Sequence, residues 1–179
     1  MTVDDNTLLK MLASPETKRK AFGLIVSQYS EMLYWKIRHF VLYHDDADDV
    51  MQNVLMKAWM NIDRFKADSK ISTWLYSIAV NESLDFLRRK KNVADADADL
   101  YAARHLMADE YFDGDATEAL LQEAIAQLPD MQRTVFLLRY YDEMKYSEMS
   151  KMLERTEGAL KASYHIAAQK VLDYIKHRD

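Results

Sequence analysis

Apolar residues recur at intervals of three and four through most of the chain, and this helical spacing constrains the fold more than any other feature. The longest example opens at Ser14 and Pro15 and continues to Phe40. A serine before a first-turn proline is a helix start signal, because it can cap N–H groups that have no partner. The 179 residues include only 3 glycines and 2 prolines, so few positions favour the tight turns of β-hairpins. We therefore expect an all-α protein.

Two further helices are expected in the N-terminal part of the chain. Asp45 and Asp46 can cap the first of them, and Ser72 or Thr73 can cap the next. The second helix ends in the basic run 88–91. Cations at this position favour a helix end because they complement the partial negative charge of the last carbonyl groups.

An acidic segment separates the N-terminal part from the C-terminal part. The whole chain carries a net charge of -5, but residues 93–118 alone carry -7, which leaves +2 on the remainder. Alanine alternates with aspartate at the start of this segment, and clear periodicity is then lost, as in a linker. We predict two small helical domains, an N-terminal bundle of residues 1–92 and a C-terminal domain of residues 116–179, joined by an acidic linker of residues 93–115.

Several classes of function are excluded or disfavoured by what the sequence lacks. The chain has no cysteine, which excludes disulfides, thiol nucleophiles and thiolate zinc sites. The start lacks an export signal and no apolar stretch reaches membrane-spanning length, so we expect a cytoplasmic protein without membrane insertion. The acids around His44 are interpreted as helix caps and dipole partners rather than metal ligands. We predict no catalytic centre, no metal and no cofactor.

The C-terminal part is expected to contain four helices and a helix-turn-helix. One helix stops at Pro129 and another opens at Asp130. A short helix over 147–153, a tight polar turn, and a longer helix from 157 to about 177 then have helix-turn-helix proportions. A solvated helical hairpin would give the same pattern, so the pattern alone does not prove DNA binding.

The exposed start of the last helix is the predicted reader of duplex DNA. Leu160, Tyr164 and Val171 fall on a stripe that faces the core, and we therefore interpret Tyr164 as a core residue. Small residues beside this stripe allow close approach to base edges, and Lys161 can pair with a phosphate or a guanine. The predicted duplex contacts are Arg155, Thr156, Glu157, Gly158, Lys161, Ala162 and His165.

A second candidate nucleic-acid site lies between Arg64 and Trp74, where aromatic, basic and hydroxyl side chains cluster at a helix-loop-helix junction. Aromatic faces stack unpaired bases, and hydroxyl groups read their exposed edges. The alternative is that Phe65 and Trp74 are core anchors beside an ordinary loop, and we favour the loop over the tryptophan as the binding element. The predicted single-strand contacts are Arg64, Lys66, Ser69, Lys70, Ser72, Thr73 and Trp74, with Arg88 and Arg89 at the end of the same helix.

The helix that follows His44 has a different polar face, which repels phosphate and suits a basic protein surface. Its members are Asp46, Asp48, Asp49, Gln52, Asn53 and Lys57. A plain solvated face would have the same spacing. The candidate protein-docking residues are Asp46, Asp49, Gln52, Asn53 and Lys57.

Taken together, these motifs resemble the extracytoplasmic-function sigma factors, the small two-domain group of bacterial sigma subunits. The segment 46–54 is similar to the family segment that docks on a coiled coil of the largest subunit of core RNA polymerase, a role that falls here on Asp46, Asp49 and Gln52. Phe65 with 72–81 is similar to the stretch that captures the non-template strand of the minus-10 element, which adds Tyr76 and Asn81 to the single-strand contacts.

The C-terminal motifs resemble the minus-35 reader of the same family. The segment 128–141 looks like its lead-in, and 158–161 matches the start of its recognition helix. The resemblance implies that the chain directs core RNA polymerase to promoters, stabilises melted minus-10 DNA, and has an anti-sigma protein as a further partner. Its departures from the family pattern are Glu154 in place of a turn glycine, Asn53 in place of a glutamate, and 163–164 in place of Arg-Leu.

Two other kinds of protein remain compatible with the residues. An ordinary helix-turn-helix regulator would bind duplex DNA and use its N-terminal helices to dimerise or to sense a signal. If the chain were a helical protein-interaction module, changes at Lys161 and His165 would leave promoter activity unchanged. The loop between Arg64 and Thr73 favours the sigma interpretation, because a duplex-binding regulator has no need of a site for unstacked bases.

Overall fold

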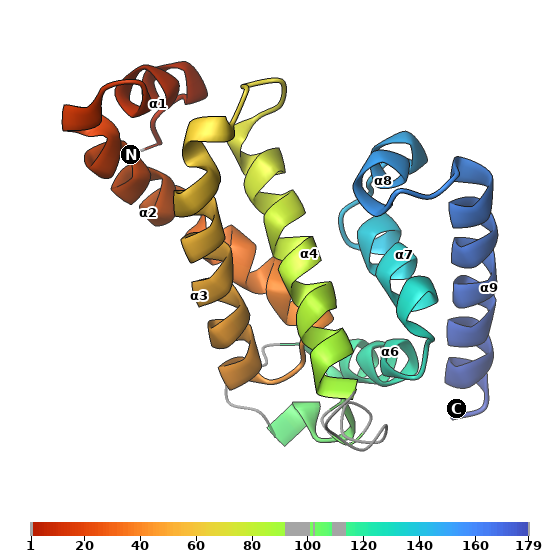
Figure 1. Cartoon of the computed structure of the whole chain (residues 1–179). Helices are drawn as coiled ribbons and strands as arrows, with labels where there is room; N and C mark the ends of the chain where they lie inside the picture. Colours follow the sequence, from red (N-terminus) through yellow and green to blue (C-terminus); the bar gives the residue numbers. More distant parts are fainter. Residues whose placement is uncertain (1, 92–100, 102, 109–113, 179) are drawn as a thin grey trace. The chain divides into compact units, whose positions relative to one another are not determined.

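The computed structural model describes residues 2–91, 101, 103–108 and 114–178, and within these ranges it contains helices and no strand. The all-α prediction is therefore confirmed. The elements in chain order are α1 (Asp5–Leu12), α2 (Pro15–Phe40), α3 (His44–Asn61), the short 3-10 helix η1 (Ile62–Arg64), α4 (Ile71–Lys91), the 3-10 helix η2 (Leu106–Ala108), α6 (Ala116–Ala126), α7 (Asp130–Tyr140), α8 (Tyr146–Leu153) and α9 (Glu157–Lys176) (Figure 1).

The chain divides into two compact units, residues 1–92 and residues 93–179. The predicted linker 93–115 falls largely outside the described residues. Its described residues 103–108 belong to the second unit, where Ala103 and Leu106 are buried and η2 packs against α6. We had expected this part of the chain to be a linker, but two apolar side chains and a helical turn give it a place in a core.

In the first unit, α2, α3 and α4 pack against one another around a shared apolar core (Figure 1). Each helix contributes one stripe of residues at three- and four-residue spacing, as amphipathic helices do. Full burial of each large side chain contributes roughly 1.5–3 kcal/mol. The core includes Ile25, Leu33, Ile37, Val50, Val54, Ala58, Leu75 and Ala79.

The helix starts in this unit differ from the predicted caps. α3 begins at His44 with Tyr43 as its N-cap, so Asp45 and Asp46 lie in the first turn, where they complement the helix dipole instead of capping it. α4 begins at Ile71, which places Ser72 and Thr73 inside its first turn. The caps were assigned two or three residues too late, because a hydroxyl or carboxylate in a first turn fits the same sequence pattern.

α1 is an element that the sequence analysis missed. Asp4 caps it by accepting the backbone N–H of Thr7 at 3.0 Å, and Leu8 is completely buried. An eight-residue helix offers hardly more than two turns for an apolar stripe, so its periodic signal is weak. α1 packs against α2.

In the second unit, α7 and α9 lie side by side, and both α6 and α8 pack against α9 (Figure 1). The predicted helices from Asp130 and from Glu157 begin at those residues. α8 begins one residue before the predicted Ser147, and α8 and α9 form the predicted helix-turn-helix pair. Their buried residues include Met149, Leu160, Ala167 and Val171.

The turn between α8 and α9 adopts a left-handed backbone conformation at Glu154, with φ 53° and ψ 45°. The backbone N–H groups of Glu154 and Arg155 both donate to the carbonyl of Ser150, which closes the helix end. Glycine is the usual residue for this conformation because it has no Cβ to clash. The turn therefore has the conformation that glycine usually adopts, with Glu154 in that position.

Candidate nucleic-acid interface

A groove of about 380 Å³ opens in the first unit, between the C-terminal half of α3 and the N-terminal half of α4. Its walls combine aromatic, amide, basic and acidic side chains. Three of the predicted single-strand contacts, Arg64, Trp74 and Asn81, are among them. The full lining is Lys57, Asn61, Arg64, Trp74, Ile78, Asn81, Glu82 and Asp85.

The groove continues along one face of α4 because its lining residues repeat every three or four positions. Trp74, Ile78, Asn81 and Asp85 follow this spacing, and Arg88 is the next position. Arg88 is exposed and pairs with Asp85 at 3.1 Å. An exposed pair of this kind contributes little to stability, so the arginine can exchange its carboxylate partner for a phosphate. Arg89 is also exposed.

Phe65 and Trp74 brace the two ends of the predicted loop against each other. Their ring centroids lie 5.0 Å apart at an interplanar angle of 34°, and both side chains are half-buried. This geometry supports the alternative in which Trp74 anchors the loop, while its placement in the groove wall leaves part of the ring accessible. Between the two rings, Lys66, Ser69 and Lys70 are exposed, as a binding loop requires.

The hydroxyl groups of Ser72 and Thr73 have no hydrogen-bond partner among the described residues, and Thr73 is exposed. The first N–H of α4, that of Ile71, donates to a carboxylate oxygen of Asp5 at 3.0 Å. Tyr76, in contrast, is 94% buried, and the Lys36 amine lies 4.2 Å from its ring centroid. Of the predicted single-strand contacts, Tyr76 is therefore packed inside the unit and not displayed in the groove.

Lys57 and Asp46 face α4 instead of the outer side of α3. The amine of Lys57 pairs with the buried carboxylate of Glu82. Asp46 pairs with Lys90 at 2.7 Å. The five predicted protein-docking residues therefore do not share one surface. Lys57 lies in the groove wall beside Arg64, and Asp46 is half-buried in an interhelical ion pair.

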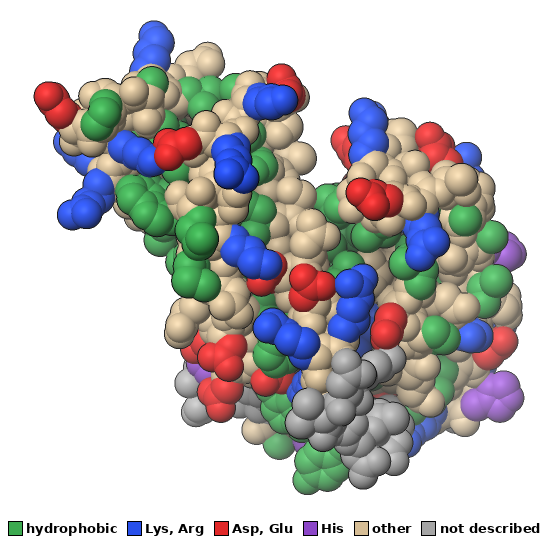
Figure 2. Space-filling view, in the orientation of Figure 1, with side chains coloured by type: hydrophobic (Ala, Val, Ile, Leu, Met, Phe, Trp, Pro, Cys, Tyr) green, Lys and Arg blue, Asp and Glu red, His purple; other side chains and the backbone are tan. Residues whose placement is uncertain are grey.

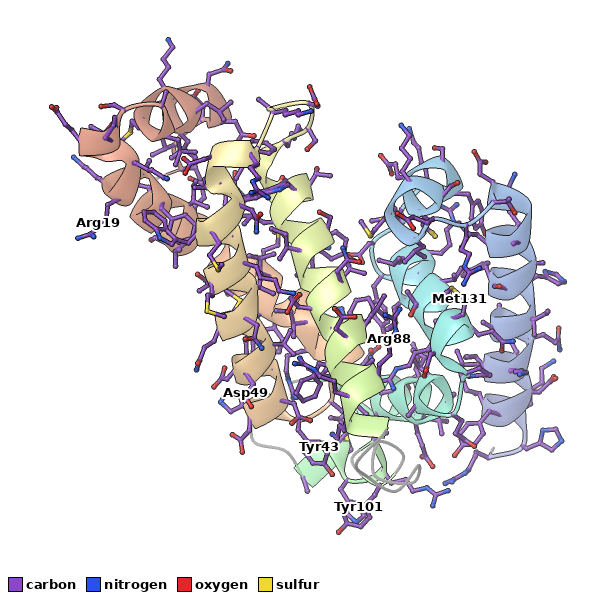
Figure 3. All side chains as sticks on the ribbon, in the orientation of Figure 1. Arg19, Tyr43, Asp49, Arg88, Tyr101 and Met131 are labelled. Carbon is purple, nitrogen blue, oxygen red and sulfur yellow. The ribbon has the colours of Figure 1, made fainter. Side chains whose placement is uncertain are left out.

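The outer face of α3 combines polar and apolar side chains. Asp49 and Gln52 are exposed there, and Asp49 projects away from α4 (Figure 3). Asn53, between this face and α4, is half-buried. Met56 and Met60 continue the outer face at helical spacing, with 56% and 70% of their surfaces exposed. These two methionines were not among the predicted docking residues, although both lie off the buried stripe of the same helix.

The start of α3 and the segment that follows its end carry opposite charge. Acidic side chains gather where the helix starts, whereas basic side chains are frequent toward its other end and over α1 and α2 (Figure 2). Residues 45–49 carry a net charge of -4, and residues 64–70, which follow the end of α3, carry +2. An acidic surface repels DNA phosphates and a basic one attracts them, so these two regions suit different partners.

In the second unit, the predicted duplex contacts form one exposed surface at the start of α9. All seven of them, from Arg155 to His165, are exposed. Thr156 is the N-cap, and its hydroxyl accepts the N–H of Ala159 at 3.2 Å. A Cβ added at Gly158 would meet nothing within 4 Å, so packing among the described residues does not require a glycine there.

Lys161 lies between an acid and an aromatic ring on this surface. Its amine is 3.9 Å from a carboxylate oxygen of Glu157 and 5.7 Å from the ring centroid of Tyr146. Both contacts are loose, and 60% of the lysine side chain is exposed. The amine is therefore oriented across the first turn of α9 but remains available to a phosphate or a base.

A buried carboxylate, Glu123 of α6, fixes the far end of α9. It accepts hydrogen bonds from Tyr174 at 2.5 Å, Arg178 at 2.7 Å and Arg104 at 2.9 Å. Burial alone would raise the pKa of Glu123, but the hydrogen bonds from Tyr174 and Arg104 and the charges of both arginines outweigh it and lower the pKa below its ordinary value. The cluster thus joins the described part of the acidic segment, through Arg104, to the recognition helix.

Metal-binding clusters and membrane-spanning helices are both absent from the described ranges. Within them, no three His, Asp or Glu side chains come together in an arrangement that could hold a metal ion. No helix there is long and apolar enough to cross a bilayer.

Comparison with known families identifies both units. Residues 25–93 match the model of Sigma-70 region 2, and residues 118–171 match that of Sigma-70 region 4. These two matches define the class as a two-region sigma subunit. The chain is 33% identical over 156 residues to the ECF RNA polymerase sigma factor SigW of Bacillus subtilis, covering 81% of this chain and 83% of the relative.

Other relatives and solved structures agree with this class. The ECF RNA polymerase sigma-E factor of Escherichia coli is 28% identical over 162 residues, covering 80% of this chain and 81% of the relative. CnrH, solved with the cytosolic domain of CnrY, has the same fold with a TM-score of 0.68, 22% identity, and coverage of 98% and 99% of the two chains. The chain belongs to the extracytoplasmic-function sigma factors, and it is an RNA polymerase sigma factor that acts in transcription initiation.

Proposed function

We propose that the two units divide promoter recognition between them. Residues 1–92 dock on core RNA polymerase through the outer face of α3 and bind unstacked minus-10 bases in the groove and in the loop 65–70. Residues 116–179 read the minus-35 duplex through the start of α9. The observation that carries this division is the charge difference within the first unit, from -4 over residues 45–49 at the start of α3 to +2 over residues 64–70 after its end.

The docking surface in this proposal is centred on Asp49 and Gln52 and extends to Met56 and Met60. Exposed acids at its start would steer the chain toward a basic surface of the polymerase. The methionines add flexible apolar area that adapts to the shape of a partner. Asp46 contributes indirectly, because its ion pair with Lys90 fixes the start of α3 against α4.

The minus-10 site captures bases only after the duplex has opened. Lys66, Lys70, Arg88 and Arg89 would bind the backbone of the non-template strand, while Trp74 offers the exposed part of its ring for stacking. Because these groups bind the melted strand and not the closed duplex, they shift the equilibrium toward the open complex by differential affinity. Bond formation stays with the polymerase, so the chain itself needs no catalytic centre.

We place the protein in the cytoplasm, with core polymerase and promoter DNA as its partners and an anti-sigma protein as its regulator. The sigma factor RpoE of Bartonella quintana, solved in complex with the anti-sigma factor NepR, supports the last part. That sigma factor has the same fold as this chain, with a TM-score of 0.65, 21% identity, and coverage of 88% of this chain and 98% of that one.

Transcription with purified core polymerase on fragmented genomic DNA tests the proposal. Specific transcripts are expected only when both the chain and core are present. The Asp49→Lys variant should lose core binding, and Lys161→Ala should weaken use of the minus-35 element. Lys170→Ala serves as the control for the second variant, because Lys170 is another exposed lysine further along α9. Specific duplex binding by the chain alone would contradict the proposal and favour an ordinary helix-turn-helix regulator.

A further inference from the structure

α1 precedes the residues that match Sigma-70 region 2, yet it is tied to that region at several points. The side-chain amide of Gln28 accepts the N–H of Val3 at 2.8 Å and donates to its carbonyl at 3.2 Å. At the other end, the hydroxyl of Thr17 donates to the carbonyl of Met11 at 2.6 Å. These contacts hold α1 against α2 at both of its ends, so α1 is a fixed part of the unit.

Asp5, the first residue of α1, joins α1, α2 and α4. One carboxylate oxygen accepts the hydroxyl of Tyr29 in α2 at 3.2 Å. The other accepts the backbone N–H of Ile71, the first residue of α4, at 3.0 Å. Ile71 is completely buried, so without this acceptor its N–H would lose a partner in a place that water does not easily reach.

The carboxylate therefore caps α4 from 66 residues away in the sequence. A helix start usually receives its cap from a local serine, threonine or aspartate. Ser72 and Thr73 are the local candidates here, and both are left without a hydrogen bond in the described part of the chain. If Asp5 were absent, α4 would shorten by two or three residues, and Ser72 or Thr73 would then turn its hydroxyl back onto the helix as the new N-cap.

We propose that Asp5 is a positioning residue for the minus-10 site. By capping α4 from outside, it holds Ile71 in the helix, keeps the hydroxyls of Ser72 and Thr73 pointing to nucleic acid, and fixes the end of the loop that carries Lys70. This inference rests on the proposed function of that loop. It assigns a role in promoter opening to a helix that lies outside the family match.

The test is the affinity of holoenzyme, core polymerase with the full chain, for fork-junction DNA with a single-stranded minus-10 non-template strand. Asp5→Ala should weaken this affinity, by up to roughly tenfold where the whole stability effect of a lost helix cap is passed on to binding. Asp5→Asn should restore most of it, because the amide oxygen still accepts the N–H of Ile71. Affinity for core and for a fully duplex minus-35 fragment should not change, which also shows that the variants are folded.

Asp4→Ala is the matched control. It removes the cap of α1 itself and so weakens the helix, but it leaves the contact with α4 in place. Equal fork-DNA affinity for Asp5→Ala and the unaltered chain would overturn the inference. Equal losses for Asp4→Ala and Asp5→Ala would also overturn it, since α1 would then matter only through its stability.

A double variant, Ser72→Ala with Thr73→Val, separates failure of the inference from failure of the proposed function. If it leaves fork-DNA affinity unchanged, the two hydroxyls do not bind the strand, and the minus-10 assignment at this position fails together with the inference. If it weakens binding while Asp5→Ala does not, only the role of Asp5 is refuted.

Discussion

Replacing Glu154 by glycine is expected to stabilise the C-terminal unit. Glu154 has a left-handed backbone, with φ 53° and ψ 45°. This conformation costs a residue with a Cβ roughly 1–2 kcal/mol. Glycine avoids that cost, but it loses about 0.5–1 kcal/mol more conformational entropy on folding. The net gain in the free energy of unfolding is therefore about 0.5–1 kcal/mol.

No other interaction is lost in this substitution. The Glu154 side chain is exposed and makes no hydrogen bond or ion pair in the described ranges. The bonds that close the turn are made by the backbone N–H groups of residues 154 and 155 and by the hydroxyl of Ser150, which donates to the carbonyl of Arg155 at 2.6 Å. All of them persist when the side chain is removed, so the change in backbone cost is the only large effect.

Chemical denaturation followed by amide hydrogen exchange in α8 and α9 measures this unit separately from the other one. The expected gain corresponds to a rise in Tm of about 2–8 °C for a unit of this size. Glu154→Ala is the control, because alanine also loses the carboxylate but keeps the Cβ and its strain. If the glycine variant is no more stable than the alanine variant, the left-handed turn is not strained and the reasoning is refuted.

Three further predictions concern ionic contacts. Glu123→Gln should destabilise the second unit at neutral pH. Because the folded pKa of Glu123 is lowered, its contribution is present above the ordinary glutamate range and is lost as the pH falls through the folded value, so unfolding curves of the two proteins should converge in acid. Lys57→Met should cost the first unit about 1–3 kcal/mol by leaving the buried carboxylate of Glu82 without its charged partner, and adding Glu82→Gln should recover much of this loss in a double-mutant cycle. Lys161→Ala should weaken binding to the minus-35 duplex by about 1–3 kcal/mol if the lysine reads a base, or lower the slope of log affinity against log salt by about one if it binds a phosphate. Fluorescence anisotropy at several salt concentrations distinguishes these two roles, and an unchanged affinity and slope would exclude both.

Helical periodicity predicted most of the fold because the major helices have long apolar stripes. α2, α7 and α9 begin where the start signals placed them. The main exception is α1. α1 is too short to show a clear period, and its role depends on a hydrogen bond between Asp5 and Ile71, which are 66 residues apart. A pattern within one segment carries no information about a cap that comes from another.

Only some residues of the candidate site were placed correctly from the sequence, because the pattern within one segment carries no information about packing between helices. Residues at the exposed start of α9 were found because small and polar side chains interrupt an otherwise regular stripe. Tyr76 was placed among the DNA contacts by resemblance, but the structure packs it beneath the amine of Lys36. The spacing of residues predicts the helix face on which a side chain lies. It does not predict which residue of another helix packs against that side chain, because this depends on the tertiary structure.

The polar residues of α3 illustrate this limit and explain how one helix can serve two partners. Asp46 pairs with Lys90 and Lys57 pairs with Glu82, so both residues face α4. The two ion pairs are separated by eleven residues of α3, or about 16 Å along the helix axis at 1.5 Å per residue. They fix the rotation of α3 relative to α4 at both ends.

This fixed rotation leaves a different set of side chains, including Asp49, Gln52 and Met60, on the outer face. The outer face turns away from α4, whereas the groove lies between α3 and α4. In the proposed function, polymerase and single-stranded DNA therefore occupy separate faces of one rigid helix pair. Binding of one does not block the other, and the polymerase-bound chain keeps its base-binding groove open, as a subunit that must hold melted DNA while docked on core requires.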